Sequence, residues 1–84
     1  MENMTRKEEV LLILMEECGE VAQRASKCIR FGGTSNDAEL EKEIGDLMCM
    51  IDLLVEDGYI DWGIVHSQAE KKRKKLEIYS NILK

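Results

Sequence analysis

Hydrophobic residues recur every three or four positions through most of this 84-residue chain, which is the spacing of one face of an α-helix. In the first third of the chain, the recurring positions are Leu11, Leu14, Met15, Cys18, Val21, Ala22, Ala25 and Ile29. Thr5 and Glu8 have the spacing of a capping box, so a first helix is expected from about residue 6 to residue 30. The apolar run over residues 10–15 spreads around more than one face of this helix. We therefore expect its second apolar face to contact another chain.

Two further helices are predicted after a short connection. The segment 31–36 reads FGGTSN, which is typical of a loop, and Ser35 or Asn36 is expected to cap the helix that follows. Gly58 suits the left-handed position that ends this helix, which is predicted over about residues 37–57. Its apolar positions are Leu40, Ile44, Leu47, Met48, Ile51, Leu54 and Val55. Asp61 is expected to cap a third helix. The apolar stripe of that helix is Val65, Ala69, Leu76, Tyr79 and Leu83.

These patterns predict one all-α domain over residues 1–84. The chain has no proline, and only 5% of its residues are aromatic, which weakens any β-sheet interpretation. A chain of about 60 residues buries only about 60% of the surface that it exposes when unfolded, so a domain of this size is marginally stable alone. We expect a small helical bundle with three main helices, completed by oligomerisation.

Composition narrows the possible functions. The 17 acidic against 12 basic residues give a net charge of −5, which argues against binding of duplex nucleic acid. The longest apolar run has six residues, whereas a membrane span needs about 20, and no charged leader precedes a cleavable signal. A cytoplasmic protein without a membrane anchor is expected. Cys18, Cys28 and Cys49 are odd in number and widely spaced, so we interpret them as small buried hydrophobic residues in a reducing compartment.

Two of the predicted helices each carry a pair of acidic residues. Glu17 and Glu20 are three positions apart in the string EECGE, where Glu16 precedes them, and Glu43 and Asp46 are three apart in the string EIGD. Like charges at this spacing repel each other by a few tenths of a kcal/mol per pair, so a cation is expected to offset the repulsion. Carboxylate oxygens from two facing helices form the type of site that Mg²⁺ or Mn²⁺ prefers. One such string alone is more often a solvated helix face.

Each acidic pair also contains a glycine inside a predicted helix. Gly19 and Gly45 each stand directly before the last acid of their pair. Glycine costs about 1 kcal/mol in a helix interior relative to alanine. A close approach of backbone or ligand would explain both glycines, although their positions can also be coincidental.

EECGE, followed after 22 residues by EIGD, resembles the EExxE and ExxD signature of the MazG-like nucleotide pyrophosphohydrolases. These enzymes belong to the all-α NTP pyrophosphatase superfamily, and this chain is similar to its short phage and bacterial members. SKCIRFG at residues 26–32 and KLEIY at residues 75–79 extend the resemblance over about residues 8–80. The resemblance implies hydrolysis of a (deoxy)nucleoside triphosphate to the monophosphate and pyrophosphate, for control of the nucleotide pool, with Mg²⁺ as cofactor and Mn²⁺ as a possible substitute.

The resemblance also assigns roles to the acidic residues. It implies that Glu17, Glu20, Glu43 and Asp46 bind the metal. Glu16, the first acid of the EExxE string, is by the same resemblance the group that activates the attacking water. Such chemistry depends on positioned metal ions and neutralised phosphate oxygens, so a protein nucleophile is not required.

Basic and aromatic residues outside the acidic pairs have less specific patterns. Lys27 and Arg30 follow the first acidic pair on the same helix. They are candidates to hold the polyphosphate. Alternatively, they form a solvated helix end, where the helix dipole favours basic residues. The basic run at residues 71–75 points all around a helix, so most of it is expected in solvent, with some side chains available to the phosphates of a neighbouring site. His66 stands alone and is expected to have a structural role or to face solvent. Phe31 is expected to pack near the loop or to stack on a base.

The sequence leaves two classes of function open. The first is the metal-dependent pyrophosphohydrolase, acting on a (d)NTP as a homodimer or homotetramer, with the base and sugar preference undetermined. The second is a non-enzymatic acidic helical module that binds a basic partner, and this alternative predicts no dependence on divalent metal.

Overall fold

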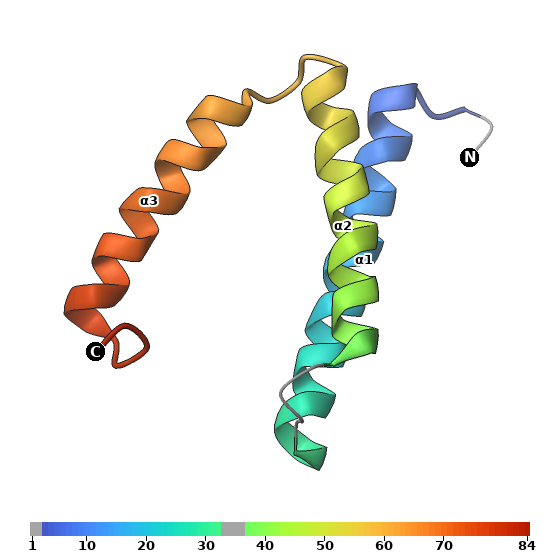
Figure 1. Cartoon of the computed structure of the whole chain (residues 1–84). Coiled ribbons are helices and arrows are strands. Elements are labelled where there is room, and N and C mark those ends of the chain that lie inside the picture. The colour runs from blue at the N-terminus through green and yellow to red at the C-terminus, as the bar shows by residue number, and fades with distance from the viewer. Residues whose placement is uncertain (1–2, 33–36) are drawn as a thin grey trace.

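The computed structural model describes residues 3–32 and 37–84, and the helices in these ranges are α1 (Arg6–Phe31), α2 (Ala38–Glu56) and α3 (Trp62–Tyr79). The described residues form no strand, so the predicted all-α class is confirmed. Figure 1 shows α1 and α2 side by side and antiparallel, as a helical hairpin, while α3 diverges from the turn at the end of α2. None of these helices is long and apolar enough to cross a membrane.

Local capping interactions explain where the helices begin. The predicted capping box is confirmed, since the Glu8 backbone N–H donates to Thr5 Oγ1 at 3.1 Å and the Thr5 N–H donates to Glu8 Oε1 at 3.0 Å. The prediction that Asp61 caps α3 is also confirmed, since its Oδ2 accepts a hydrogen bond from the Ile64 N–H at 2.9 Å. The α-helix α2 ends before Gly58, whose φ of 78° is the left-handed conformation predicted there.

The prediction for the cap of α2 was wrong. Its N-cap is Asp37, whose Oδ1 accepts a hydrogen bond from the Leu40 N–H at 2.9 Å. Ser35 and Asn36 lie outside the described residues. Asp37 takes this role because it directly precedes the first helical residue, which places its carboxylate at the free N–H groups of the first turn.

The hydrophobic core lies between α1 and α2. Within the described ranges, the buried hydrophobic residues are Val10, Met50 and Leu54. Partly buried residues pack around them, namely Ile13, Leu14, Leu53 and Ile60. This core is small for a chain of 84 residues, so most of the apolar side chains of the hairpin remain accessible.

Ion pairs link the two helices of the hairpin at separate levels. Arg6, at the start of α1, donates from Nε to Asp57 Oδ2 at 2.7 Å beyond the end of α2. Arg24 donates from Nε and a terminal nitrogen to both oxygens of Asp37, at 3.1 and 2.9 Å. The second pair has the two-bond geometry that fixes orientation. Together they hold the antiparallel helices in register.

The third helix does not close onto the hairpin to form a compact three-helix bundle within one chain (Figure 1). Ile64, Ile78 and Tyr79 on α3 are 71%, 67% and 84% exposed. The basic run at residues 71–75 separates the apolar positions Val65 and Ala69 from Leu76 and Tyr79 along α3.

The expectation that the cysteines are buried was also wrong for the single chain. Cys18 and Cys49 are exposed, and Cys28 is half-buried. Cys28 Sγ donates a hydrogen bond to Asp37 Oδ2 at 3.0 Å, so this thiol is a polar partner and not a simple packing group. The exposed thiols lie on helix faces that point away from the core of the hairpin.

Candidate metal centre

Three carboxylates converge between α1 and α2. Glu17 of α1 and Glu43 and Asp46 of α2 each offer an oxygen atom, and these atoms all lie within 4.8 Å of one another. They come from segments 26 or more residues apart in sequence, and only the antiparallel packing of the helices brings them together. The structure therefore groups three of the four residues expected to bind metal.

The depth of the site varies between its members. Glu17 and Glu43 are half-buried, and the side chain of Glu43 is only 15% exposed, whereas that of Asp46 is 48% exposed. Glu43 and Asp46 are one helical turn apart, so they flank the same edge of α2. The cluster is thus seated in the helix interface and open to solvent on one side.

The electrostatics of the cluster favour a bound cation. Burial raises the pKa of Glu17 above its ordinary value, and the negative charges of Asp46 and Glu43 add to that increase. Lys42 partly offsets this repulsion, because its Nζ lies 3.6 Å from Glu43 Oε1 and 3.7 Å from Asp46 Oδ2. The two acids in turn raise the pKa of Lys42.

Sequence reasoning missed Lys42. Its spacing of four residues from Asp46 is the signal that could have revealed it, since such pairs meet on one helix face. Its side chain is 63% exposed, so the ion pairs are weak and Lys42 can yield to a more highly charged cation.

The other two acids of the first motif lie at the edge of the cluster. Glu16 and Glu20 are exposed on α1, and their charges contribute to the raised pKa of Glu17. Glu20 is not in the group of oxygens that meet within 4.8 Å. The structure therefore places both residues beside the converging carboxylates and not among them.

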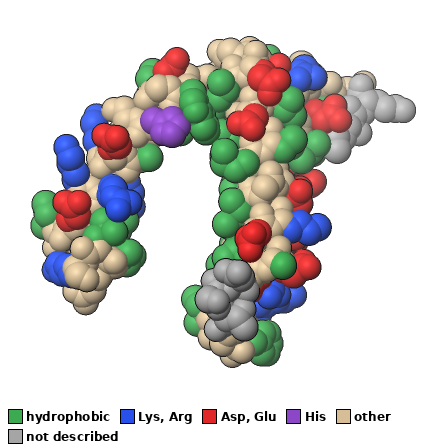
Figure 2. Space-filling model, viewed as in Figure 1, with side chains coloured by type: hydrophobic (Ala, Val, Ile, Leu, Met, Phe, Trp, Pro, Cys, Tyr) green, Lys and Arg blue, Asp and Glu red, His purple; other side chains and the backbone are tan. Residues whose placement is uncertain are grey.

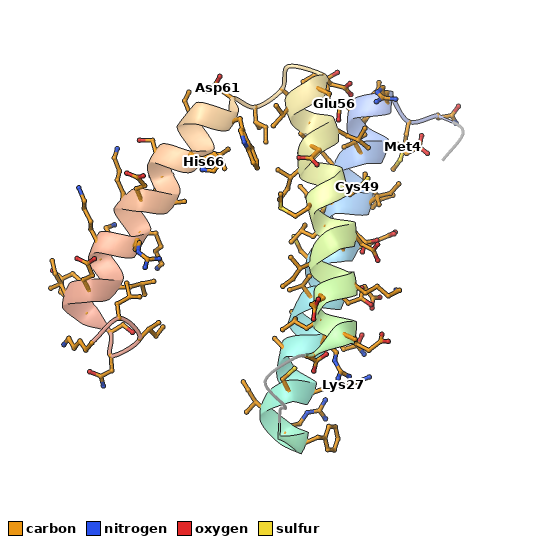
Figure 3. The ribbon with its side chains drawn as sticks, viewed as in Figure 1. Met4, Lys27, Cys49, Glu56, Asp61 and His66 are labelled. Atoms are coloured by element: carbon orange, nitrogen blue, oxygen red, sulfur yellow. The ribbon has the colours of Figure 1, made fainter. Side chains whose placement is uncertain are left out.

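The basic residues proposed for phosphate binding lie further along α1. Lys27 is exposed near the end of this helix (Figure 3). Arg30 is exposed too, and its guanidinium lies 5.2 Å from the centroid of the Phe31 ring, which is itself 76% exposed. His66, expected to be structural, lies edge-on to Trp62 with ring centroids 4.7 Å apart.

A second polar network joins α1 to the start of α2. The Asp37 carboxylate accepts hydrogen bonds from Arg24, Cys28 and the Leu40 N–H. These hydrogen bonds, with that of Arg24 the largest in effect, hold the pKa of Asp37 well below its ordinary value. Asp37 raises the pKa of the Cys28 thiol, because that thiol donates a hydrogen bond to the negatively charged carboxylate. Arg24 and Cys28 are four residues apart on one face of α1, which is the only sequence signal of this network.

The two glycines of the acidic motifs face open space. A Cβ atom built on Gly19 or Gly45 meets no heavy atom within 4 Å among the described residues. The expected close approach of backbone is therefore absent within the described part of this chain. Both glycines are exposed to solvent.

The chemistry of the donor set fits a hard divalent cation. The converging ligand atoms are all carboxylate oxygens, which suit Mg²⁺ or Mn²⁺, whereas zinc and copper prefer imidazole or thiolate. Three negative charges within such a short distance also match a doubly charged ion better than a single ammonium.

Comparison with known protein families identifies the family of this chain. A family model described as the MazG nucleotide pyrophosphohydrolase domain matches residues 5–77. The chain belongs to the MazG family. The matched MazG region contains both acidic motifs, the whole of α1 and α2, and most of α3. The resemblance inferred from EECGE and EIGD is thereby confirmed.

Membership in the MazG family gives the general activity. MazG domains are nucleotide pyrophosphohydrolases that generally depend on a divalent metal. No curated protein and no solved structure matched the chain.

Proposed function

We propose that this MazG-family chain hydrolyses (deoxy)nucleoside triphosphates between the α- and β-phosphates, releasing the monophosphate and pyrophosphate. The convergence of Glu17, Glu43 and Asp46 within 4.8 Å is the observation that carries the proposal. Half-buried carboxylates that two helices bring together repel each other, and this repulsion costs stability. A purely solvated acidic face is therefore not expected to contain such a cluster.

Mg²⁺ is the proposed cofactor, with Mn²⁺ as a substitute. Glu17, Glu43 and Asp46 would hold the ion, and Glu20 would complete the set from the edge of the cluster. When bound, the ion would neutralise charge on the phosphate oxygens and lower the pKa of a nearby water.

The remaining residues of α1 would act on water and phosphate. Glu16 is exposed beside Glu17, so its carboxylate is accessible to accept a proton from the attacking water. Lys27 and Arg30 would hold the polyphosphate, since both are exposed cations on the helix that carries Glu16. Hydrolysis of a nucleoside triphosphate depends on positioned metal ions and neutralised phosphate oxygens, so no protein nucleophile is required.

We further propose that the protein works in the cytoplasm as a homodimer or homotetramer. The three free cysteines suit a reducing compartment. The small core and the many accessible apolar side chains support assembly with further copies.

Product analysis tests this function. Each (d)NTP is incubated with the purified protein and Mg²⁺, Mn²⁺ or EDTA, and the products are separated by chromatography. We expect monophosphate and pyrophosphate with either metal, and no turnover with EDTA. Release of diphosphate and inorganic phosphate would place the cleavage at the wrong bond. Absence of turnover with every nucleotide and metal would favour the non-enzymatic acidic module.

A further inference from the structure

A basic residue, Lys42, contacts the carboxylate cluster. Its Nζ lies 3.6 Å from Glu43 Oε1 and 3.7 Å from Asp46 Oδ2. Within the parts of the chain that the structure describes, no ion pair reaches Glu17. One ammonium therefore faces three carboxylates, and the cluster keeps an excess of negative charge.

The position of this ammonium is not a simple result of helix geometry. Residues four apart on a helix are neighbours, so a contact between Lys42 and Asp46 is expected. Adjacent residues point about 100° apart around the helix axis, so Lys42 and Glu43 have no such tendency to meet. The Lys42 ammonium nevertheless lies beside Glu43, whose side chain is only 15% exposed. The ammonium thus leans toward the helix interface, where the carboxylates converge.

The contacts of Lys42 with the two acids are loose. Both distances are longer than about 2.7–3.2 Å, the usual range of an N–H···O hydrogen bond. The arginine ion pairs that link the two helices are shorter, at 2.7 Å for Arg6 and 2.9 Å for Arg24. The arginine fork fixes one geometry, whereas a lysine ammonium is a point charge on a flexible stem. Lys42 is therefore suited to leave its two partners.

Solvent reaches both the ammonium and the cluster. The side chains of Lys42 and Asp46 are 63% and 48% exposed. Figure 2 shows red and blue side chains mainly along the edge of the hairpin that faces away from α3. A cation from solvent can therefore approach the carboxylates, and the ammonium can turn away from them into water.

We propose that Lys42 is the counter-ion of the carboxylate cluster in the metal-free protein, that it gives way to a divalent cation, and that it then binds a phosphate oxygen of the nucleotide. Lys42 leaves the carboxylates because a doubly charged ion competes for the same oxygens and repels the ammonium. Its flexible stem then lets the ammonium follow the phosphates. This inference rests on the proposed function, because it requires the cluster to bind metal and the substrate to carry phosphates.

Lys42 lies closer to the cluster than the phosphate-binding candidates of α1 do. Lys27 and Arg30 are ten and thirteen residues beyond Glu17, which is about 15 and 20 Å along the helix. Lys42 is already at ion-pair distance from two residues of the cluster. It therefore suits a phosphate oxygen next to the metal ion, whereas Lys27 and Arg30 suit parts of the substrate further away.

Calorimetric titration with Mg²⁺ or Mn²⁺, in the absence of nucleotide, tests the counter-ion. Lys42→Met keeps an unbranched stem but removes the ammonium, so it is expected to bind each ion about three- to tenfold more tightly than the wild type. Lys42→Arg keeps the charge and is expected to bind no more tightly than the wild type. Lys7→Met is the matched control, because Lys7 is an exposed lysine of α1 outside the cluster.

The outcomes of this titration separate the counter-ion from the metal centre. Equal affinity in the wild type and Lys42→Met would overturn the counter-ion while leaving the metal centre in place. The same increase in Lys7→Met as in Lys42→Met would also overturn it, because the effect would then come from net charge alone. A wild type that binds neither ion would overturn the metal centre, and the proposed function with it.

Thermal denaturation separates displacement from a structural role of Lys42. In EDTA, Lys42→Met is expected to melt a few degrees below the wild type, because the cluster has lost its counter-ion. With saturating Mg²⁺, the two proteins are expected to melt at nearly the same temperature, since Lys42 has then left the carboxylates. A loss of equal size under both conditions would contradict the displacement.

Steady-state kinetics at saturating Mg²⁺ tests the contact with phosphate. For a (d)NTP that the wild type hydrolyses, the KM of Lys42→Met is expected to rise about tenfold, while its affinity for Mg²⁺ also rises. Tighter binding of the ion together with weaker binding of the substrate is not the result of a general loss of structure. An unchanged KM in Lys42→Met would contradict the phosphate contact, even though the enzyme hydrolyses nucleotides.

Discussion

Glu17 has unfavourable electrostatic surroundings for a charged carboxylate. Its pKa is raised by burial and by Asp46 and Glu43, so the folded protein binds a proton at this carboxyl more readily than the unfolded chain does. Stability from this group is therefore greatest at low pH and declines as the pH rises above the ordinary value of 4.5. A divalent cation would remove this penalty at neutral pH.

Glu17→Gln is expected to raise the melting temperature at pH 7 in EDTA, because it removes a charge that its neighbours repel. The same variant is expected to lose the rise in melting temperature that millimolar Mg²⁺ or Mn²⁺ gives the wild type. Thermal denaturation with metal or EDTA measures both effects. Glu41→Gln, an exposed acid of α2 outside the cluster, is the control and is expected to behave as wild type. An undiminished metal response in Glu17→Gln would remove this residue from the site.

Asp37 combines a helix cap with an ion pair, and the two roles can be separated. Arg24, Cys28 and the Leu40 N–H depress its pKa, so its stabilising effect is present above pH 3.8 and is lost as the pH falls below that value. Asp37→Ala is expected to lower the melting temperature by several degrees at pH 7. Asp37→Asn retains the cap and is expected to lower it less. Equal losses in both variants would show that the charge, and not the cap, carries the effect.

At the scale of helices, alanine substitutions at Gly19 and Gly45 test whether the open space beside these glycines stays open in the protein. Gly19→Ala and Gly45→Ala are each expected to raise the free energy of unfolding by about 1 kcal/mol, since the added Cβ meets open space. Gly58→Ala is the contrast, because a φ of 78° makes it destabilising by about 1 kcal/mol. Urea denaturation measures all three. A destabilising effect of Gly19→Ala or Gly45→Ala would show that the assembled protein brings another surface to these positions.

The extents of the helices were predictable because their signals are local. Thr5, Glu8 and Asp61 act within one turn of their own helix, and the apolar spacing repeats over many residues. The cap of α2 was misassigned because several polar residues precede that helix. The resemblance predicted four acidic metal ligands, and the structure brings three of them together, namely Glu17, Glu43 and Asp46. The ion pairs of Lys42 and the contacts of Arg24 with Asp37 depend on packing that periodicity alone does not specify.

At the scale of the whole molecule, the position of α3 was the least predictable feature. The apolar spacing of residues 62–79 predicts that a helix forms there, but it does not predict the angle between α3 and the hairpin. That angle leaves the second apolar face of α1 exposed, including Met15 and Ile29. Cys18, which was expected to be buried, is exposed for the same reason, because it lies on the second apolar face of α1.

The central claim is that the carboxylate cluster is a metal centre for nucleotide hydrolysis, and a matched pair of α2 variants tests it most directly. Asp46→Asn and Asp52→Asn each remove one exposed carboxylate charge, but only Asp46 belongs to the cluster. With a hydrolysable (d)NTP and Mg²⁺, we expect Asp52→Asn to form monophosphate and pyrophosphate at nearly the wild-type rate, and Asp46→Asn to fall at least about 100-fold. Equal rates in the two variants would contradict the account.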